Sequence, residues 1–188
     1  GGGGGGGGGG NKRRYLVVAT GFNHFASGAT RPFSLALFSS QPIVLQRVSV
    51  PIGGVRSLLK LFVSDPTVST VDNWNGVTFT QRKDGHQLLY YVDNTQQSAA
   101  CEVTINFSRF TNMVSSRGAL DSMTIIDSVP PGHSQFMCAL VPVAEQFGYG
   151  FSTQYSIKPQ MFGFGGSDTH VPPIPPDSMH SPYPMKWR

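Results

Sequence analysis

Short apolar stretches with a two-residue period recur along the chain from residue 15 to residue 157. In residues 100–107 the apolar side chains include Cys101, Val103, Ile105 and Phe107, and such alternation is typical of a strand with one buried face. Residues 135–141 form a continuous apolar run, as expected of a central strand buried on both faces. Further strands are predicted over residues 15–19, 32–38, 43–48, 77–80, 87–92, 123–126 and 147–157.

Turn signals separate these strands. Residues 72–76 (DNWNG) predict a turn, and residues 83–85 (KDG) are typical of a hairpin. In residues 129–132 the two prolines fix φ, while Gly132 permits a positive φ. At least seven short strands divided by such turns, without a convincing amphipathic helix, predict an all-β fold with an antiparallel β-sandwich.

Residues 55–63 fit either a short helix or a strand. Leu58, Leu59 and Phe62 would share one face of a helix. Prolines bracket the segment closely on both sides, however, and this favours a strand over a helix.

The character of the chain changes after residue 158. Residues 161–166 are rich in Gly and residues 171–184 in Pro, and such a composition is not expected to join a sheet. Residues 159–188 are therefore predicted to form an extended tail that lies across a partner like a strap. The aromatic residues of this tail that we expect to contact the partner, because no core is available to them locally, are Phe162, Phe164, Tyr183 and Trp187.

The first ten residues are an unbroken Gly run. Without it the chain has 13 Gly in 178 residues, which is the ordinary background frequency. We interpret residues 1–10 as a placeholder for unassigned residues or as low-complexity sequence, and assign no function to them.

The composition of the remainder is that of a folded domain with little charge. Of the 188 residues 39% are hydrophobic and 11% aromatic, which is enough to build a core. Charged residues make up only 13%, about half the usual share. This low share indicates that much of the surface is covered by something else.

The net charge of +4 comes with one basic run, formed by Lys12, Arg13 and Arg14. A dedicated nucleic-acid binder usually has a denser basic stripe. The run mildly favours a polyanionic neighbour such as RNA or the acidic tails of tubulin, and we include these three residues among the candidate partner contacts. A membrane partner is not expected, because the longest apolar stretches are far too short to span a bilayer.

The two cysteines, Cys101 and Cys138, lie inside predicted strands and are expected to be buried, reduced thiols. The five histidines lack metal-ligand spacing, the acidic residues are scattered singly, and no phosphate-binding Gly loop or GxSxG motif is present. We expect no catalytic residue, no metal and no cofactor. The protein is predicted not to be an enzyme.

Several motifs resemble a calpain-type β-sandwich, the domain III of that family. Residues 15–22 (YLVVATGF), followed after a Gly-containing loop by residues 31–40 (RPFSLALFSS), are similar to the end of such a sandwich. Residues 129–133 (VPPGH) resemble the family's Leu-Pro-Pro-Gly turn. A strand with Phe and Tyr, residues 150–156, follows as it does in the family.

The resemblance implies a domain order and a loss of activity. Residues 11–50 would be the end of a first sandwich and residues 51–158 most of a second. The protease core with its Cys, His and Asn, and the acidic loop that engages calcium and phospholipid, are not visible in the sequence. Protozoan relatives of calpain often lack the catalytic residues and serve as cytoskeletal or scaffold proteins, which implies a similar role here.

These observations predict a non-catalytic structural subunit of a large eukaryotic assembly, either a ciliary or flagellar microtubule or an organellar ribosome. The chain would be intracellular, at the cytoskeleton or flagellum or in the mitochondrion. One alternative is a peripheral lipid-binding domain that uses loops such as residues 21–31 and 83–87. Another is the regulatory part of a longer calpain-like cysteine protease.

Overall fold

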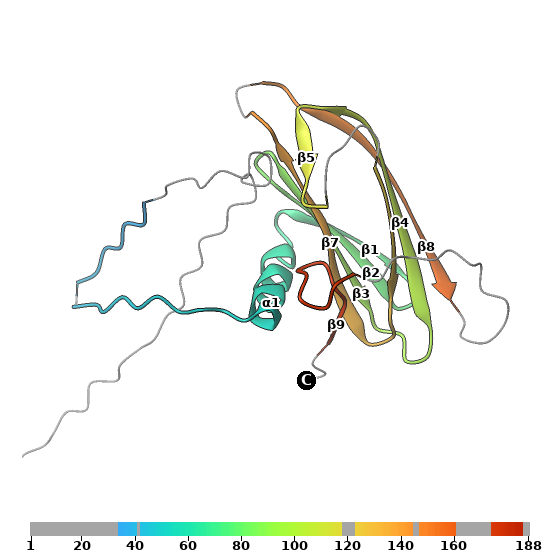
Figure 1. The fold of residues 1–188 in the computed structure, drawn as a ribbon, viewed down its shortest axis with the longest axis horizontal. Helices are drawn as coiled ribbons and strands as arrows, with labels where there is room; N and C mark the ends of the chain where they lie inside the picture. The colour runs from blue at the N-terminus through green and yellow to red at the C-terminus, as the bar shows by residue number, and fades with distance from the viewer. Residues whose placement is uncertain (1–33, 41, 118–122, 145–146, 161–173, 186–188) are drawn as a thin grey trace, which may run out of the picture.

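The computed structural model describes residues 34–40, 42–117, 123–144, 147–160 and 174–185. Within these ranges one helix precedes a series of antiparallel strands (Figure 1). The elements are α1 (Ile52–Val63), β1 (Ser69–Trp74), β2 (Val77–Asp84), β3 (Gln87–Asn94), β4 (Ala100–Thr111), β5 (Met113–Ser115), β6 (Met123–Val129), β7 (His133–Pro142), β8 (Gly150–Gln160) and β9 (Tyr183–Pro184).

The strands form two facing sheets, which confirms the predicted antiparallel β-sandwich. The larger sheet has the order β1-β2-β3-β7-β5, and β9 also pairs with β7. The smaller sheet has the order β6-β4-β8. In Figure 1 the strands β4 and β8 lie on one side of β7 and β3, α1 lies on the other side, and β9 runs beside β7.

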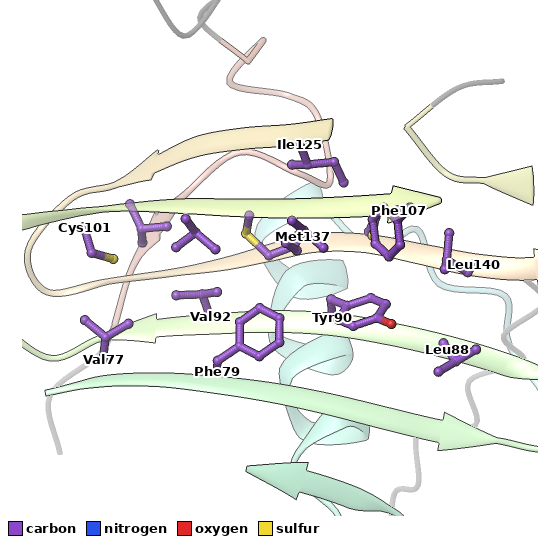
Figure 2. Packing of buried hydrophobic residues seen from close by; sticks show 14 of the residues in the cluster. Val77, Phe79, Leu88, Tyr90, Val92, Cys101, Phe107, Ile125, Met137 and Leu140 are labelled. Carbon is purple, nitrogen blue, oxygen red and sulfur yellow. The ribbon is translucent and has the colours of Figure 1, made fainter. Parts of the chain in front are cut away.

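The main core fills the space between the two sheets, and Figure 2 shows its side chains pointing from both sheets toward one another. The Tyr90 ring of β3 meets the Phe107 ring of β4 edge-on, with centroids 5.5 Å apart. The alternation predicted for β4 is confirmed, because its four inward apolar side chains are at most 2% exposed. The buried members of this core are Val77, Phe79, Leu88, Tyr90, Val92, Cys101, Val103, Ile105, Phe107, Met113, Ile125, Val129, Met137, Cys138 and Leu140.

The turns follow the positions that tolerate a positive φ. The predicted hairpin between β2 and β3 is present, with Gly85 at φ 58°. Gly132 also has a positive φ, 69°, as predicted. The turn predicted over residues 72–76 is narrower than expected, because Asn75 and Gly76 (φ 43° and 77°) suffice for a two-residue hairpin and β1 extends to Trp74.

The strand favoured for residues 55–63 is wrong, because the segment belongs to α1. Pro51 is the N-cap residue, a position compatible with proline, and its carbonyl accepts from the amides of Gly54 and Val55. The second bracketing proline lies beyond the C-cap, Ser64, where helices commonly end. The prolines therefore mark the limits of a helix. Leu59 packs on the larger sheet from the buried face of this helix.

The strands predicted at 32–38 and 43–48 do not form in the described residues. Residues 34–40 and 42–50 have no helix or strand and are exposed throughout. Figure 1 shows this stretch running away from the sandwich before it enters α1. The pattern is that of strands, but none of the strands in the described residues pairs with it. The strand predicted at 15–19 lies outside the described residues, and the assignment of residues 11–50 to a first sandwich stays a prediction.

A buried polar network closes one side of the sandwich. The Arg117 guanidinium, which follows β5, donates to the Asp127 carboxylate of β6 at 2.8 Å. The amide of Gln135 on β7 donates to the other Asp127 oxygen at 2.7 Å. Burial raises the pKa of Asp127, which is 1% exposed, above its ordinary value. The nearby Arg117 charge acts in the opposite direction but has the smaller effect. On the opposite side, the Tyr155 hydroxyl of β8 donates to a carboxylate oxygen of Asp72 on β1, nearer to solvent.

Two glycines give a test of the corrected helix. A Cβ at Gly53, in the first turn of α1, would have no atom within 4 Å. We expect Gly53→Ala to raise the free energy of unfolding by about 0.5–1 kcal/mol, because Ala has the higher helix propensity. Gly85→Ala should lower it by about 1 kcal/mol, because Gly85 has a positive φ. Urea unfolding measures both, and a loss for Gly53→Ala would contradict the helix.

The buried network should contribute more to stability than the exposed bond on the opposite side. Asp127→Ala leaves the Arg117 charge and the Gln135 amide without their partner, and we expect a loss of about 3 kcal/mol. Tyr155→Phe should cost less than about 1 kcal/mol, because Tyr155 is 38% exposed and Asp72 can then bond to water. Equal losses in urea unfolding would show that Asp127 has no special role.

Candidate functional site

The two thiols are buried, as predicted. Cys101 and Cys138 are both free cysteines with no exposed surface. Burial raises the pKa of the Cys101 thiol to about 11, and burial raises the pKa of the Cys138 thiol still further. The reactive form of a cysteine is the thiolate, so neither side chain has the properties of a nucleophile at neutral pH.

The described histidines have separate environments. His86 lies at the exposed β2–β3 hairpin, where its ring meets the Tyr149 ring edge-on at 5.3 Å. His133 Nδ1 lies 2.8 Å from the carbonyl oxygen of Pro131, and His180 is buried. Across the described ranges no three His, Cys, Asp or Glu side chains converge as metal ligands. In the same part of the chain, no helix is long and apolar enough to cross a membrane. His24 and His170 lie outside the described residues.

A second apolar layer covers the face of the larger sheet that points away from β4. It consists of α1 and residues 174–185, which we call the C-terminal segment. These two parts of the chain are far apart in sequence and lie beside each other over β7 and β3 (Figure 1). The apolar residues that meet where this layer contacts the sheet are Leu59, Val63, Leu89, Tyr91, Phe136, Ala139 and Val141, with Val55, Phe62, Val114, Met179 and Tyr183 packed against them.

Arg56 joins α1 to the C-terminal segment. It is only 7% exposed, and its Nη2 donates to the carbonyl oxygens of Pro176 and Ser178, both at 2.5 Å. Its guanidinium carbon also lies 6.0 Å from the centroid of the Tyr183 ring. A buried cation that bonds to main-chain carbonyls fixes the path of a peptide, and these bonds do not depend on the identity of the peptide's side chains.

Two tyrosines connect the segment to the sheet. The hydroxyl of Tyr183 donates to the carbonyl oxygen of Arg56 at 3.1 Å, and it also bonds to the hydroxyl of Tyr91 on β3. Because a carbonyl can only accept, Tyr183 is the donor there and Tyr91 donates to Tyr183. Burial, together with this bond, raises the pKa of Tyr91 well above its ordinary value.

Beneath these tyrosines lies an ion pair between α1 and the sheet. Lys60 Nζ donates to Asp93 Oδ1 at 2.6 Å and to Ser134 Oγ at 3.1 Å, and Ser134 also donates to Asp93. Ser134 is the residue of β7 that pairs with Tyr183 of β9. Helix, sheet and C-terminal segment thus meet in one bonded cluster.

His180 is the most buried titratable group of the segment. Its ring stacks on Phe136 with centroids 5.3 Å apart. Its Nδ1 lies 3.1 Å from the carbonyl oxygen of Phe136, and its Nε2 lies 3.3 Å from that of Ser116. Burial, helped by the nearby Arg117 charge, lowers the pKa of His180 from 6.5 to about 4, although the two carbonyls act in the opposite direction.

Residues 34–40 and 42–50, which we call the N-terminal arm, form a different kind of surface. Phe38 and Val44 are each 95% exposed, and Leu45 is 68% exposed. Arg47 is the single charged residue in this range of the sequence. The other apolar side chains exposed on the arm are Leu35, Leu37, Ile43, Val48 and Val50.

Of the residues predicted to contact a partner, the structure describes Tyr183 alone. The premise that no core is available to Tyr183 is wrong, because Tyr183 packs against its own sheet and α1. The expectation that the tail cannot join a sheet is also wrong for its described part. Pro184 lies in β9, a strand of two residues, and its missing amide is tolerated there. Lys12, Arg13, Arg14, Phe162, Phe164 and Trp187 lie outside the described residues.

Sequence reasoning missed three residues that build the second layer: Arg56, Tyr91 and His180. Arg56 lies between Val55 and Leu59 in α1, and a cation placed among apolar residues of a helix was an available signal for a buried bond. The partners of Arg56 are 120 and 122 residues away in the chain, so no local pattern could have named them.

A comparison with known families gives the identity of the sandwich. A model of the calpain-D-like, C-terminal domain matches residues 64–162, which is more than half of the chain. The chain belongs to this calpain-D-like family. The resemblance to a calpain-type β-sandwich is therefore confirmed, and the chain carries the C-terminal, non-protease part of calpain-like proteins. No curated protein and no solved structure matches the chain.

The limits of the family match divide the molecule. They include β1 to β8, together with two of the motifs that carried the resemblance, residues 129–133 and 150–156. They exclude the third motif, at residues 15–40, and also the N-terminal arm, α1 and the C-terminal segment. The N-terminal arm and the second apolar layer's covering elements therefore lie outside the matched calpain-D-like sandwich.

The depressed pKa of His180 predicts a loss of stability in acid. Between pH 6.5 and pH 4 the unfolded chain binds a proton at His180 that the folded protein does not bind, so unfolding becomes easier as the pH falls. From pH 7 to pH 4.5 we expect the wild-type protein to lose about 2 kcal/mol more than His180→Gln in urea unfolding. His86→Gln, at the exposed hairpin, should retain the wild-type loss. The same pH dependence in both variants would contradict the assignment to His180.

Proposed function

We propose that this chain is a non-catalytic binding domain, and that it serves as a structural subunit of a large eukaryotic assembly. The observation that carries the proposal is the N-terminal arm. Phe38 and Val44 are almost fully exposed on it, in a stretch whose pattern is that of buried strands. Isolated apolar residues are common on protein surfaces, but such a run is typical of a segment that a partner covers.

The size of the arm is sufficient for a specific interface. Burial of one large apolar side chain contributes roughly 1.5–3 kcal/mol. Four such side chains would contribute roughly 6–12 kcal/mol before the costs of association are subtracted. The low share of charged residues in the whole sequence, 13%, agrees with extensive contact.

The kind of assembly is proposed from the calpain-like character and the charge of the chain. The calpain-like character without a visible protease core favours a scaffold role, as in ciliary or flagellar microtubules. The net charge of +4, with Lys12, Arg13 and Arg14 in one run, favours a polyanionic neighbour, either tubulin tails or the RNA of an organellar ribosome. We propose a location at the cytoskeleton or flagellum or in the mitochondrion on the same grounds.

The family match favours a second candidate. Because the chain corresponds to a C-terminal domain, it would also suit the regulatory part of a longer calpain-like cysteine protease. The coding sequence upstream distinguishes the two functions. A papain-like Cys, His and Asn set there would support the protease, and a protein without that set would support the scaffold.

Substitutions on the arm test the binding function. We expect Phe38→Ser with Val44→Ser to leave the melting temperature unchanged, because both side chains are 95% exposed. The same double variant, tagged and expressed in the native cell, should lose at least tenfold in occupancy of large particles on a density gradient, measured by quantitative mass spectrometry.

A matched control separates this effect from general surface hydrophobicity. Leu61 is 73% exposed on α1, outside the arm, and Leu61→Ser should keep full occupancy. Full occupancy of the arm variant as well would show that the arm makes no contact in the assembly.

A further inference from the structure

The outer face of β7 and β3 beside α1 holds the C-terminal segment in the way that a binding site holds a peptide. We call the residues that contact it the docking face: Arg56 of α1, Tyr91 of β3, Phe136 of β7 and Ser116 after β5. Arg56 binds two carbonyls of the segment, Phe136 stacks on its imidazole and Tyr91 bonds to its phenol.

Main-chain pairing completes the contact. Tyr183 and Pro184 pair with the first residues of β7, and the amide of Met185 donates to the carbonyl oxygen of Gly132 at 2.9 Å. Addition of a short strand to a sheet, with pockets for single side chains, is a common mode of peptide recognition. The described contacts to the docking face thus begin at Pro176 and end at Met185.

The segment also stabilises its own bound shape. The amide of Ser178 donates to the carbonyl oxygen of Pro175 at 2.9 Å, and the Ser181 hydroxyl donates to the same oxygen at 2.9 Å. Two internal turns of this kind, with the restricted φ of four prolines, reduce the entropy that the segment loses when it docks. Preorganisation of this kind favours binding of the segment as a separate peptide.

The covalent connection does not restrict the segment to its own docking face. Thirteen residues, 161–173, separate the end of β8 from Ile174. A chain of that length spans at most about 45 Å when it is fully extended. A connection of that length can therefore reach beyond the copy that carries it.

We propose that the C-terminal segment exchanges between copies of this chain, so that the docking face of one copy binds residues 174–185 of a second copy. The contacts are the same in cis and in trans, because both copies have the same sequence. Reciprocal exchange gives a closed, two-fold symmetric dimer that needs no new surface. The balance between the two forms depends on local concentration, which is high where copies are held side by side.

The docking face shares no residue with the N-terminal arm, so the exchange and the proposed function can fail independently. It also differs from a general apolar patch, because it specifies its ligand. The ligand offers two carbonyls to Arg56, an imidazole to Phe136 and a phenol to Tyr91.

The first experiment measures whether the segment is a separable ligand, in the full chain with a protease site placed between residues 161 and 173. After cleavage we expect the fragment to stay bound and to exchange with a fluorescent peptide of residues 174–185, followed by polarisation. Arg56→Gln in the protein, or Tyr183→Phe in the peptide, should each weaken peptide binding at least tenfold. Lys158→Gln, on β8, should leave it unchanged.

The second experiment tests the exchange between copies. One protein is the full chain with Arg56→Gln, which has an intact segment and a weakened docking face. The other is the cleaved protein from which the fragment has been displaced, which has an intact docking face. We expect a one-to-one complex of the two by light scattering after size exclusion, and a concentration-dependent dimer for the uncleaved wild type.

Three results would overturn the proposal. If the cleaved protein retains its circular dichroism but does not bind the peptide, the segment is not a separable ligand. If the cleaved protein unfolds when the fragment leaves, the segment is part of the core and cannot exchange. If the peptide binds but the mixed proteins and the wild type stay monomeric up to about 0.5 mM, the docking face acts in cis or for a different polypeptide.

Discussion

The larger sheet has two apolar faces, and the rest of the architecture depends on covering both. In β7, nine successive residues are buried, with Met137, Cys138 and Leu140 in the core between the sheets and Phe136, Ala139 and Val141 in the second layer. The smaller sheet covers the first face. The second face needs α1 and the C-terminal segment, which together supply most of the covering side chains. A simple two-sheet sandwich would leave Phe136 in water.

The polar groups of the fold lie where these layers meet. Asp127 of β6, in the smaller sheet, bonds to Gln135 of β7 in the larger sheet and to Arg117, which follows β5. Asp93 joins α1 to the larger sheet through Lys60, and Arg56 joins α1 to the C-terminal segment. Asp127 and Arg56 are buried and Asp93 is half-buried, and each has a charged or main-chain partner, which limits the cost of removing it from water. The layers are therefore held in one register by bonds as well as by apolar contact.

The strands of the sandwich could be predicted from patterns among neighbouring residues. Alternation in β4, the apolar run of β7 and the glycine of the β2–β3 hairpin each depend on neighbouring residues, and they predicted the strands and their turns. The second layer was not predictable in the same way. The helix was hidden by its glycines and bracketing prolines, and Tyr183 lies 92 residues from Tyr91. The N-terminal arm shows the reverse case, since its pattern is that of strands but the described fold offers it no partner.

The position of His180 in the chain has a consequence for biosynthesis. The ring that covers Phe136 is 44 residues later in the sequence. When β7 first leaves the ribosome, α1 and β3 have already been made, but Phe136 lacks the His180 ring until the C-terminal segment has been made. An incomplete chain thus differs from a finished one by an exposed phenylalanine. Chaperones that bind apolar surface could therefore bind Phe136 only before the C-terminal segment has been made and has docked.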